Sequence, residues 1–318
     1  MKKNMIKLGI IGLGHMGGYH ASVCTSSQNV DLVGVADPHE SNLQKIKAAT
    51  VIKSLDYTTW IDSVDGVIIA VPTQYHYEIA KDCLARGKHV LLEKPLTKEI
   101  YQAEDLFATA QKVGVALHVG HVERFNGAVQ ELKKIIDKPY MIESHRMGPF
   151  SPRVQKDSVI LDLMIHDLDI ILNLVGSPVK SLNVQGKKVH TDSCDIAIVQ
   201  LGFENGAIAN IVSSRASQIK KRTMAIHQEN AFIQLDFTTQ DISIHRHGSA
   251  SVQVGTDQLK YKQEATIEHL FVYKDNPLKL EVEHFVAAIK AGDNLANPEQ
   301  DITALALTFE IEKRLGLR

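Results

Sequence analysis

The feature that most constrains the fold is a glycine motif close to the start of the chain. The apolar run Leu8–Ile11 leads directly into Gly12-Leu13-Gly14-His15-Met16-Gly17, which is a GxGxxG pattern. By itself such a motif is often a chance match, but here it follows a predicted strand and precedes a predicted helix. Glycines are needed at that tight turn, where the backbone meets a diphosphate and the helix packs on the strand. The residues expected to contact a dinucleotide here are Gly12, Gly14, His15, Met16 and Gly17.

A carboxylate follows the second predicted strand. Val30–Ala36 ends at Asp37, about 20 residues past the glycines, which is where dinucleotide-binding sequences place an acidic residue. A carboxylate at this point can accept hydrogen bonds from both adenosine ribose hydroxyls and would repel a 2′-phosphate. An alternative role for Asp37-Pro38 is a plain turn and helix cap. With the glycine motif in register and no arginine following closely, we favour the ribose role and predict NAD rather than NADP.

Up to about Gly120, short apolar runs alternate with amphipathic stretches such as Glu78–Arg86 and Lys98–Val113. The runs are apolar almost throughout, as expected for parallel strands that are covered on both faces. The predicted strands are Lys7–Ile11, Val30–Ala36, Gly66–Ala70, His89–Leu92 and Val115–Gly120. The alternation predicts an α/β domain with a doubly wound parallel sheet.

Beyond Gly120 the pattern changes to several β-prone stretches and a few helices. Glu204-Asn205-Gly206 is typical of a hairpin turn, because Asn-Gly accepts positive φ. The predicted strands are Val179–Val189, Asp195–Phe203, Ala207–Ser213, Met224–His227 and Ala231–Phe237, and the predicted helices are Ser158–Val175, Leu278–Ala291 and Asp301–Leu315. We expect an antiparallel or mixed sheet with helices on one face. The expected domains are residues 1–121 and 122–318, with the option that one C-terminal helix packs back on the first domain.

Composition narrows the classes of partner. A chain of 318 residues is long enough for two domains. Its net charge of -2 gives no electrostatic reason to expect nucleic acid or an acidic membrane surface as partner. Cys24, Cys83 and Cys194 lack CxxC spacing, so we expect reduced, semi-buried thiols and no metal site. The opening apolar run is too short for a membrane span or a signal peptide, which predicts a cytoplasmic protein.

Two further loops follow the carboxyl ends of predicted strands, the edge where ligands gather in such sheets. Val71-Pro72-Thr73 makes Pro72, Thr73 and His76 candidate cofactor contacts. The alternative is that Thr73 caps the next helix and His76 lies on its surface, and the sequence does not decide between the two.

The second of these loops is Glu93-Lys94-Pro95. Because proline holds its predecessor out of the helical region, Lys94 should stay extended at the strand end, with its ammonium group beside the nicotinamide. A lysine there can stabilise a developing alkoxide or pass a proton, and Glu93 is counted among the cofactor contacts. The alternative, a solvated loop lysine, is less favoured at the end of a strand.

The predicted helix around Asp162 is apolar nearly all round and should therefore be buried. Asp162, His166 and Asp169 are spaced i, i+4 and i+7 on one stripe, which Asn173 continues, while Asp167 points elsewhere as a surface or structural residue. An imidazole beside a carboxylate suits removal of a hydroxyl proton while hydride leaves the same carbon. A structural polar network inside the core explains this stripe equally well.

Together, Gly12–Gly17, Asp37, Glu93-Lys94-Pro95 and the Asp162…His166 pair resemble the glucose–fructose oxidoreductase/inositol dehydrogenase family, often written Gfo/Idh/MocA. The resemblance covers nearly the whole chain, including Gly120–Asn126. It implies an N-terminal Rossmann domain and a C-terminal α+β domain with a large open, mainly antiparallel sheet. It also implies a homodimer or homotetramer, because this sheet commonly packs against a partner subunit.

The resemblance further implies an NAD-dependent oxidoreductase that transfers hydride between nicotinamide and a secondary alcohol of a sugar, sugar nucleotide or cyclic polyol. Carried over, Lys94 and His166 are the catalytic pair, and Asp162 orients the substrate or supports the proton relay. Two other classes stay open: a glycoside hydrolase that uses transient oxidation by tightly held NAD, and a redox-inert NAD-binding regulator. The lysine, aspartate and histidine set argues against the regulator.

Within the family, the run His121–Asn126 and the helix Leu161–Asp169 look most like sugar-nucleotide members, which implies a UDP-sugar as substrate. Arg124, Arg146 and Arg153 are candidates for a diphosphate or carboxylate partner, and Arg124 is our expected substrate contact beside the catalytic residues. The alternative for all three is that they are ordinary surface arginines.

Overall fold

The computed structural model describes residues 5–151, 157–255, 258–292 and 297–318, with side chains at these positions other than 247–265. The chain forms two compact units, each made of two stretches: Met1–Phe125 with Asp275–Ala306, and Asn126–Lys274 with Leu307–Arg318. The first unit extends four residues beyond the expected boundary at 121, and it also takes residues 275–306 from the expected second domain, 122–318. Helix α7 (Pro277–Ala291) belongs to the first unit, because its apolar face, which includes Val282 and Phe285, is part of that unit's core.

The first unit contains a six-stranded parallel sheet, which confirms the predicted doubly wound α/β architecture. In order across the sheet, its strands are β3 (Ile52–Ser54), β2 (Val30–Ala36), β1 (Ile6–Ile11), β4 (Gly66–Ile69), β5 (His89–Glu93) and β6 (Leu117–Gly120). The predicted strands agree with these within two residues. The sequence did not reveal β3, which is three residues long and has two exposed positions.

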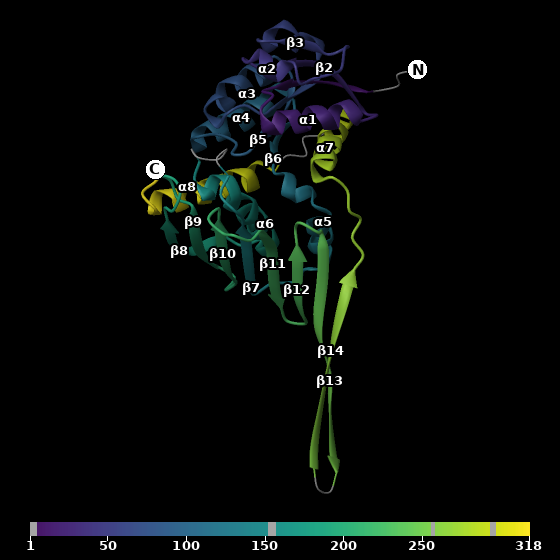
Figure 1. Ribbon diagram of the computed structural model, residues 1–318, viewed down its shortest axis with the longest axis vertical. Helices are drawn as coiled ribbons and strands as arrows, with labels where there is room; N and C mark the ends of the chain where they lie inside the picture. The colour runs from purple at the N-terminus through teal and green to yellow at the C-terminus, as the bar shows by residue number, and fades with distance from the viewer. Residues whose placement is uncertain (1–4, 152–156, 256–257, 293–296) are drawn as a thin grey trace. The chain divides into compact units, whose positions relative to one another are not determined.

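The helices of the first unit cover this sheet. They are α1 (His15–Ser26), α2 (Glu40–Leu43), α3 (His76–Ala85), α4 (Ile100–Val113) and α7. Helix α1 packs against α7, and α3 packs against α4 (Figure 1). Strand residues such as Ile10, Ile68 and Leu91 are at most 1% exposed, as the continuous apolar runs predicted.

The second unit contains an eight-stranded sheet, in which β7 and β10 are parallel and the other neighbours are antiparallel. In order, its strands are β14 (Gln258–Leu270), β13 (Asp241–Gly255), β12 (Ala231–Asp236), β11 (Lys221–Gln228), β7 (Met141–Met147), β10 (Ile208–Ser214), β9 (Ile196–Phe203) and β8 (Val179–Lys187). The predicted Asn205-Gly206 hairpin is confirmed, since it joins antiparallel β9 and β10 and Gly206 has φ +89. Strands β13 and β14 extend well beyond the others (Figure 1).

The helix predicted at Ser158–Val175 is not uniform. A π-helical turn, Ile160–Met164, precedes α6 (Ile165–Val175), so the expectation of one continuous α-helix was wrong at its start. Its burial was predicted correctly, because Ile160, Met164 and Leu168 are 0% exposed within the core of the second unit. The other helices here are α5 (Gly127–Ile135) and part of α8 (Pro298–Arg314), which both units share.

The three cysteines, Cys24, Cys83 and Cys194, are all free and are more buried than expected. Burial raises the pKa of Cys24 and Cys83 to about 12, which makes them poor nucleophiles.

None of the described helices has the length and apolar character needed to span a bilayer.

Candidate functional site

The glycine motif forms a tight turn at the end of β1. Gly12 has φ +90, and a Cβ there would lie 2.6 Å from the carbonyl oxygen of Ala70, while a Cβ on Gly17 would overlap the carbonyl oxygen of Gly12. The fold itself therefore requires these two glycines. A Cβ on Gly14 would meet nothing within 4 Å among the described residues. Helix α1 begins at His15, directly after Gly14, so its first N–H groups face a position that the fold leaves open for an anion.

Alanine at Gly14 is expected to weaken dinucleotide binding without harming the fold. The added methyl group would enter the open space where the diphosphate is expected, so the Kd for NAD should rise by roughly tenfold or more, or about 1.4 kcal/mol. Isothermal titration calorimetry with NAD, together with the melting temperature, measures both effects. Gly18→Ala is the matched control, because a Cβ there also meets nothing within 4 Å among the described residues. Equal NAD affinities in the two variants would contradict the predicted site.

Asp37 is buried at the end of β2, 5% exposed, and is bound to the glycine motif. Its Oδ2 accepts a hydrogen bond from the Leu13 backbone N–H at 2.7 Å, and its Oδ1 accepts from the His39 N–H at 2.9 Å and the Asn42 side-chain amide at 3.0 Å. Each carboxylate oxygen carries two lone pairs, so these three bonds leave one acceptor position, on Oδ2, for a ribose hydroxyl. The sequence-based role of Asp37 is chemically compatible with this arrangement and stays a prediction.

The loop after β4 contains the next candidates. Pro72 is exposed, Thr73 is half-buried, and His76 is 1% exposed, so the alternative of a surface histidine was wrong. His76 joins two loops, since its Nδ1 lies 3.0 Å from the Pro95 carbonyl oxygen and its Nε2 lies 2.9 Å from that of Val71. Burial lowers the pKa of His76 more than these carbonyl groups raise it. The imidazole thus fixes the loop that follows Lys94, while cofactor contact by Pro72, Thr73 and His76 stays a prediction.

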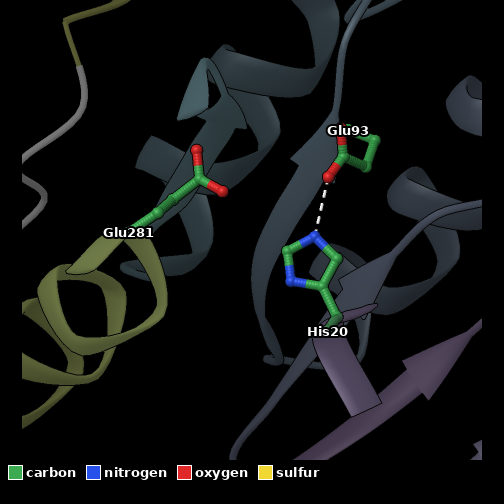
Figure 2. A group of neighbouring side chains, drawn as sticks. All are labelled: His20, Glu93 and Glu281. Carbon is green, nitrogen blue, oxygen red and sulfur yellow. Dashed lines mark hydrogen bonds and ion pairs between the residues drawn. The ribbon is translucent and has the colours of Figure 1, made fainter. Parts of the chain in front are cut away.

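Lys94 directly follows β5 and is half-buried, and the residue before it belongs to a buried cluster. Glu93 is 7% exposed, and its Oε1 lies 2.7 Å from Nε2 of His20 in α1. Figure 2 shows this pair with Glu281 of α7; one ligand atom from each of the three side chains lies within 4.8 Å of the others. The Glu93 side chain therefore ties the end of β5, and with it Lys94, to helix α1. Its expected contact with the cofactor stays a prediction.

Glu281 is 2% exposed, and neither of its carboxylate oxygens has a hydrogen-bond partner among the described residues. Burial raises the pKa of Glu281 well above its ordinary value, the nearby charge of Glu93 raises it further, and Arg124 opposes both. We conclude that Glu281 is a neutral carboxylic acid. The sequence analysis missed His20 and Glu281. A signal for Glu281 was present, because it interrupts the apolar face of α7 that includes Leu278 and Phe285.

Glutamine at Glu281 is expected to stabilise the protein at neutral pH. The folded state holds a proton that the unfolded chain releases above its ordinary pKa of 4.5, so wild-type stability decreases as the pH rises from there. Glutamine does not ionise, so the variant should melt roughly 2–4 °C higher at pH 7, which corresponds to about 1 kcal/mol, and no higher below pH 4.5. Thermal melts across this range measure the difference.

Glu283→Gln is the matched control, because Glu283 lies in the same helix, is only half-buried, and should show no such pH-dependent gain. A lower melting temperature for Glu281→Gln would contradict the conclusion that Glu281 is neutral in the folded protein. It would indicate a charged carboxylate with a positive partner, such as a divalent cation held by His20, Glu93 and Glu281.

In the second unit, Asp162 lies in the π-helical turn and His166 lies in the first turn of α6, and both side chains are half-buried. A π turn has more residues than an α turn, so Asp162 is displaced from the stripe that the i, i+4 spacing predicted. Asp169 is 1% exposed. The structure thus gives the two candidate catalytic side chains partial access to solvent, and their roles stay predictions.

Asp167 is structural and not a surface residue, which settles the choice that the sequence left open. It is 0% exposed and binds Arg146 of β7, with Nη2–Oδ1 at 2.9 Å and Nε–Oδ2 at 3.0 Å. The Arg146 guanidinium also lies 4.7 Å from the centre of the Phe237 ring. The guanidinium of Arg146, which the sequence offered as a candidate to bind a diphosphate, is therefore paired with a buried carboxylate.

Of the other two candidate arginines, Arg124 lies in the first unit, where its Nη2 is 2.5 Å from Oδ1 of the buried Asp301. Its expected contact with substrate stays a prediction, and the ion pair gives it a structural role as well. Arg153 lies outside the described residues.

A cavity of about 240 Å³ lies within the second unit. Its walls come from the end of β7 and the loop after it, the π turn, and the segment that joins β10 to β11. The residues that line it are Arg146, Met147, Gly148, Pro149, Ser151, Asp162, Leu163, Arg215, Lys220 and Arg222. One predicted catalytic carboxylate therefore shares a cavity with four cationic side chains, of which the sequence analysis had considered only Arg146.

Comparison with known proteins relates this geometry to a family. The model of the oxidoreductase family with an NAD-binding Rossmann fold matches residues 6–121, and that of the GFO/IDH/MocA C-terminal domain matches residues 129–234. A UDP-N-acetylglucosamine 3-dehydrogenase from Acidithiobacillus ferrooxidans is 31% identical over 288 residues, which cover 90% of this chain and 89% of the relative. A crystal structure of the UDP-N-acetylglucosamine 3-dehydrogenase from this organism superimposes with a TM-score of 0.86 over 96% of both chains, at 29% identity.

Other similar proteins are named for a sugar phosphate or an inositol. A glucose-6-phosphate 3-dehydrogenase from Bacillus subtilis is 34% identical over 240 residues, which cover 67% of this chain and 69% of the relative. A scyllo-inositol dehydrogenase from Lactobacillus casei, solved with bound NAD(H) and scyllo-inositol, shares the fold with a TM-score of 0.79 over 97% of this chain and 96% of that chain, at 18% identity. The predicted family, fold class and enzyme class are confirmed: the chain belongs to the Gfo/Idh/MocA family of NAD-binding oxidoreductases and is a dehydrogenase.

Proposed function

We propose that this protein oxidises the C3 hydroxyl of a UDP-linked amino sugar, with UDP-N-acetylglucosamine as the first candidate, and passes the hydride to NAD. The family as a whole supports NAD-dependent oxidoreduction of sugar alcohols. Two relatives are named as 3-dehydrogenases, and the substrate in each name is a sugar that carries phosphate. This shared chemistry supports a phosphorylated sugar over a free inositol.

The observation that carries the proposal is the cavity that contains Asp162. An inositol is uncharged, so a cavity for it has no need of cationic side chains. Lys220 and Arg222 instead give this cavity the chemistry of an anion site, since the other two cations that line it, Arg146 and Arg215, are bound to buried carboxylates. A carboxylate at its wall is suited to accept hydrogen bonds from sugar hydroxyls, which is the role we assign to Asp162.

The proposed mechanism divides the chemistry between side chains and cofactor. The His166 imidazole accepts the proton of the reacting hydroxyl, and the Lys94 ammonium stabilises the negative charge that develops on its oxygen. Bound nicotinamide supplies the hydride acceptor. The residues that would hold the dinucleotide are Gly12, Gly14, His15, Met16, Gly17 and Asp37, and their open turn and spare acceptor capacity fit such a group. Asp37 also favours NAD over NADP, because its carboxylate would repel a 2′-phosphate.

Absorbance of reduced nicotinamide tests the proposal. Purified protein is mixed with NAD or NADP and with a panel of inositols, free hexoses, hexose phosphates and UDP-sugars. Formation of NADH with UDP-N-acetylglucosamine, and slower reaction with NADP, is the expected result. A signal only with inositols or free hexoses would overturn the proposed substrate. Silence across the panel, with NAD shown to bind, would favour an internal-redox hydrolase or a regulator.

The assembly of this protein is a separate question. The family resemblance predicts a homodimer or homotetramer, and this stays a prediction that light scattering coupled to size-exclusion chromatography can test.

A further inference from the structure

The charges around the cavity of the second unit do not balance. Two of its cationic side chains are neutralised by buried carboxylates behind the cavity wall. Arg146 is 2% exposed and binds Asp167, as described above. Arg215 is 4% exposed and binds Asp195, with Nε–Oδ1 at 2.7 Å. These two arginines are buried within the fold, and their charges are compensated.

The Arg215–Asp195 pair is part of a larger buried network. Oδ2 of Asp195 accepts hydrogen bonds from the backbone N–H groups of Val189, His190 and Thr191, at 2.7–2.9 Å. Burial alone would raise the pKa of Asp195, but these bonds and the one from Arg215 outweigh it and hold the pKa well below its usual range. Asp195 is therefore fully ionised at neutral pH, and Arg215 has a permanent counter-charge.

Lys220 and Arg222 differ from the other two cations. No carboxylate of the described chain forms an ion pair with either side chain, although both line the cavity. Arg222 also lies directly opposite Arg146 in the antiparallel pairing of β11 with β7. Because Asp167 already neutralises Arg146, the positive charge on this part of the cavity that has no buried counter-charge belongs to Lys220 and Arg222, and an anion in the cavity would balance it.

Strand geometry separates these two residues from their neighbour. Side chains alternate along a strand, so Arg222 lies on the cavity side of β11 and Lys221, the first residue of the strand, lies on the other side. Lys220 precedes the strand and also lines the cavity. Lys221 does not line the cavity, and its charge acts instead on His145, whose pKa is lowered mainly by burial and then by Lys221. Three consecutive basic residues thus divide into two that face the cavity and one that does not.

We propose that Lys220 and Arg222 bind the phosphoryl group of the sugar substrate and thereby select phosphorylated sugars over free ones. The inference rests on the proposed function and extends it to particular residues. A volume of about 240 Å³ lies below the roughly 300–1,000 Å³ of pockets that enclose a whole ligand, so the cavity fits one part of a sugar nucleotide. The charge of Asp162 repels phosphate, which places the phosphoryl group towards Lys220 and Arg222 and the sugar hydroxyls towards Asp162.

Direct binding of UDP, which does not depend on turnover, tests the proposed site. Titration calorimetry compares wild type with Arg222→Gln, Lys220→Gln and the double variant, after circular dichroism has shown that each is folded. Each single variant is expected to raise the Kd for UDP by about tenfold, since hydrogen bonds to charged groups contribute that much, and the double variant by more. Lys221→Gln is the matched control and should bind UDP as wild type does. Equal affinity in all four variants would overturn the proposal.

Steady-state kinetics separates failure of this inference from failure of the proposed function. If Arg222→Gln raises KM for UDP-N-acetylglucosamine with little change in kcat, the two residues bind the phosphoryl group as proposed. If wild type oxidises this substrate and the variant keeps its KM, the subsite is wrong and the proposed function stands. If wild type neither binds UDP nor oxidises UDP-sugars but oxidises free polyols, both fail.

Discussion

Replacing His166 by alanine is expected to lower kcat by about 10²–10⁴-fold, the usual contribution of a positioned general base. Without the imidazole, the hydroxyl proton would pass to water while the hydride leaves, and the barrier would rise. The Kd for NAD should not change, because the glycine motif and Asp37 belong to the first unit and His166 belongs to the second. Stopped-flow or steady-state absorbance of NADH gives kcat, and calorimetry gives the Kd.

Lys94→Ala should also lower kcat, since the substrate oxygen that develops negative charge would lose its ammonium partner. Two matched controls accompany the pair. His227→Ala removes a half-buried histidine of β11, and Lys98→Ala removes an exposed lysine four residues beyond Lys94. Both controls should retain near-normal turnover. If His166→Ala and Lys94→Ala also retained it, the assigned catalytic pair would be wrong.

Asparagine at Asp167 is expected to lower the free energy of unfolding by about 3–5 kcal/mol, because it removes the carboxylate that pairs with the buried guanidinium of Arg146. Arg146 and Asp167 are 2% and 0% exposed, so the charge is lost at a position with little access to solvent. The change should appear in urea unfolding as a lower midpoint with an unchanged slope.

The double variant Arg146→Met/Asp167→Asn checks the reason for this loss. It removes both charges and keeps an apolar side chain over Phe237, so it should recover most of the stability that Asp167→Asn loses. Asp241→Asn is the matched control, since it breaks the exposed pair with Lys274 and should cost about 1 kcal/mol or less. If the double variant were as unstable as the single one, the effect would come from lost packing and not from an unpaired charge.

The first unit was largely predictable from sequence because its signals are local. Continuous apolar runs mark β1 and β4. Gly12 is recognisable because its turn needs positive φ, and Gly17 because a Cβ there would overlap Gly12 within the same turn. Asp37 was found for the same reason, since its distance along the chain from the glycines is characteristic. The hydrogen-bond donors to the Asp37 carboxylate were not predictable, because they depend on which N–H groups lie near it after folding.

The second unit was harder because its decisive contacts are not local. Burial alternates along strand β7, but its residues do not alternate between polar and apolar. The polar run from Glu143 to Arg146 therefore gave no sequence signal for a strand. Arg146 was considered as a ligand for substrate, yet its partner Asp167 is 21 residues further along the chain and only the folded chain pairs them. Lys220 and Arg222 were missed for a related reason. Only the register of β11 against β7 sets Arg222 opposite Arg146, and only the folded chain brings Lys220 to the same cavity.

The π turn at Ile160–Met164 has a consequence for how this site can be altered. Such a turn amounts to one residue inserted into an α-helix, and the extra residue is absorbed within that turn. Deleting one residue there would convert the segment to regular α-helix and rotate everything before it by about 100° around the helix axis. Asp162 would move while His166 and the buried Asp167–Arg146 pair kept their places. The carboxylate that faces the cavity and the imidazole on α6 are therefore adjustable independently, although they are only four positions apart in the chain.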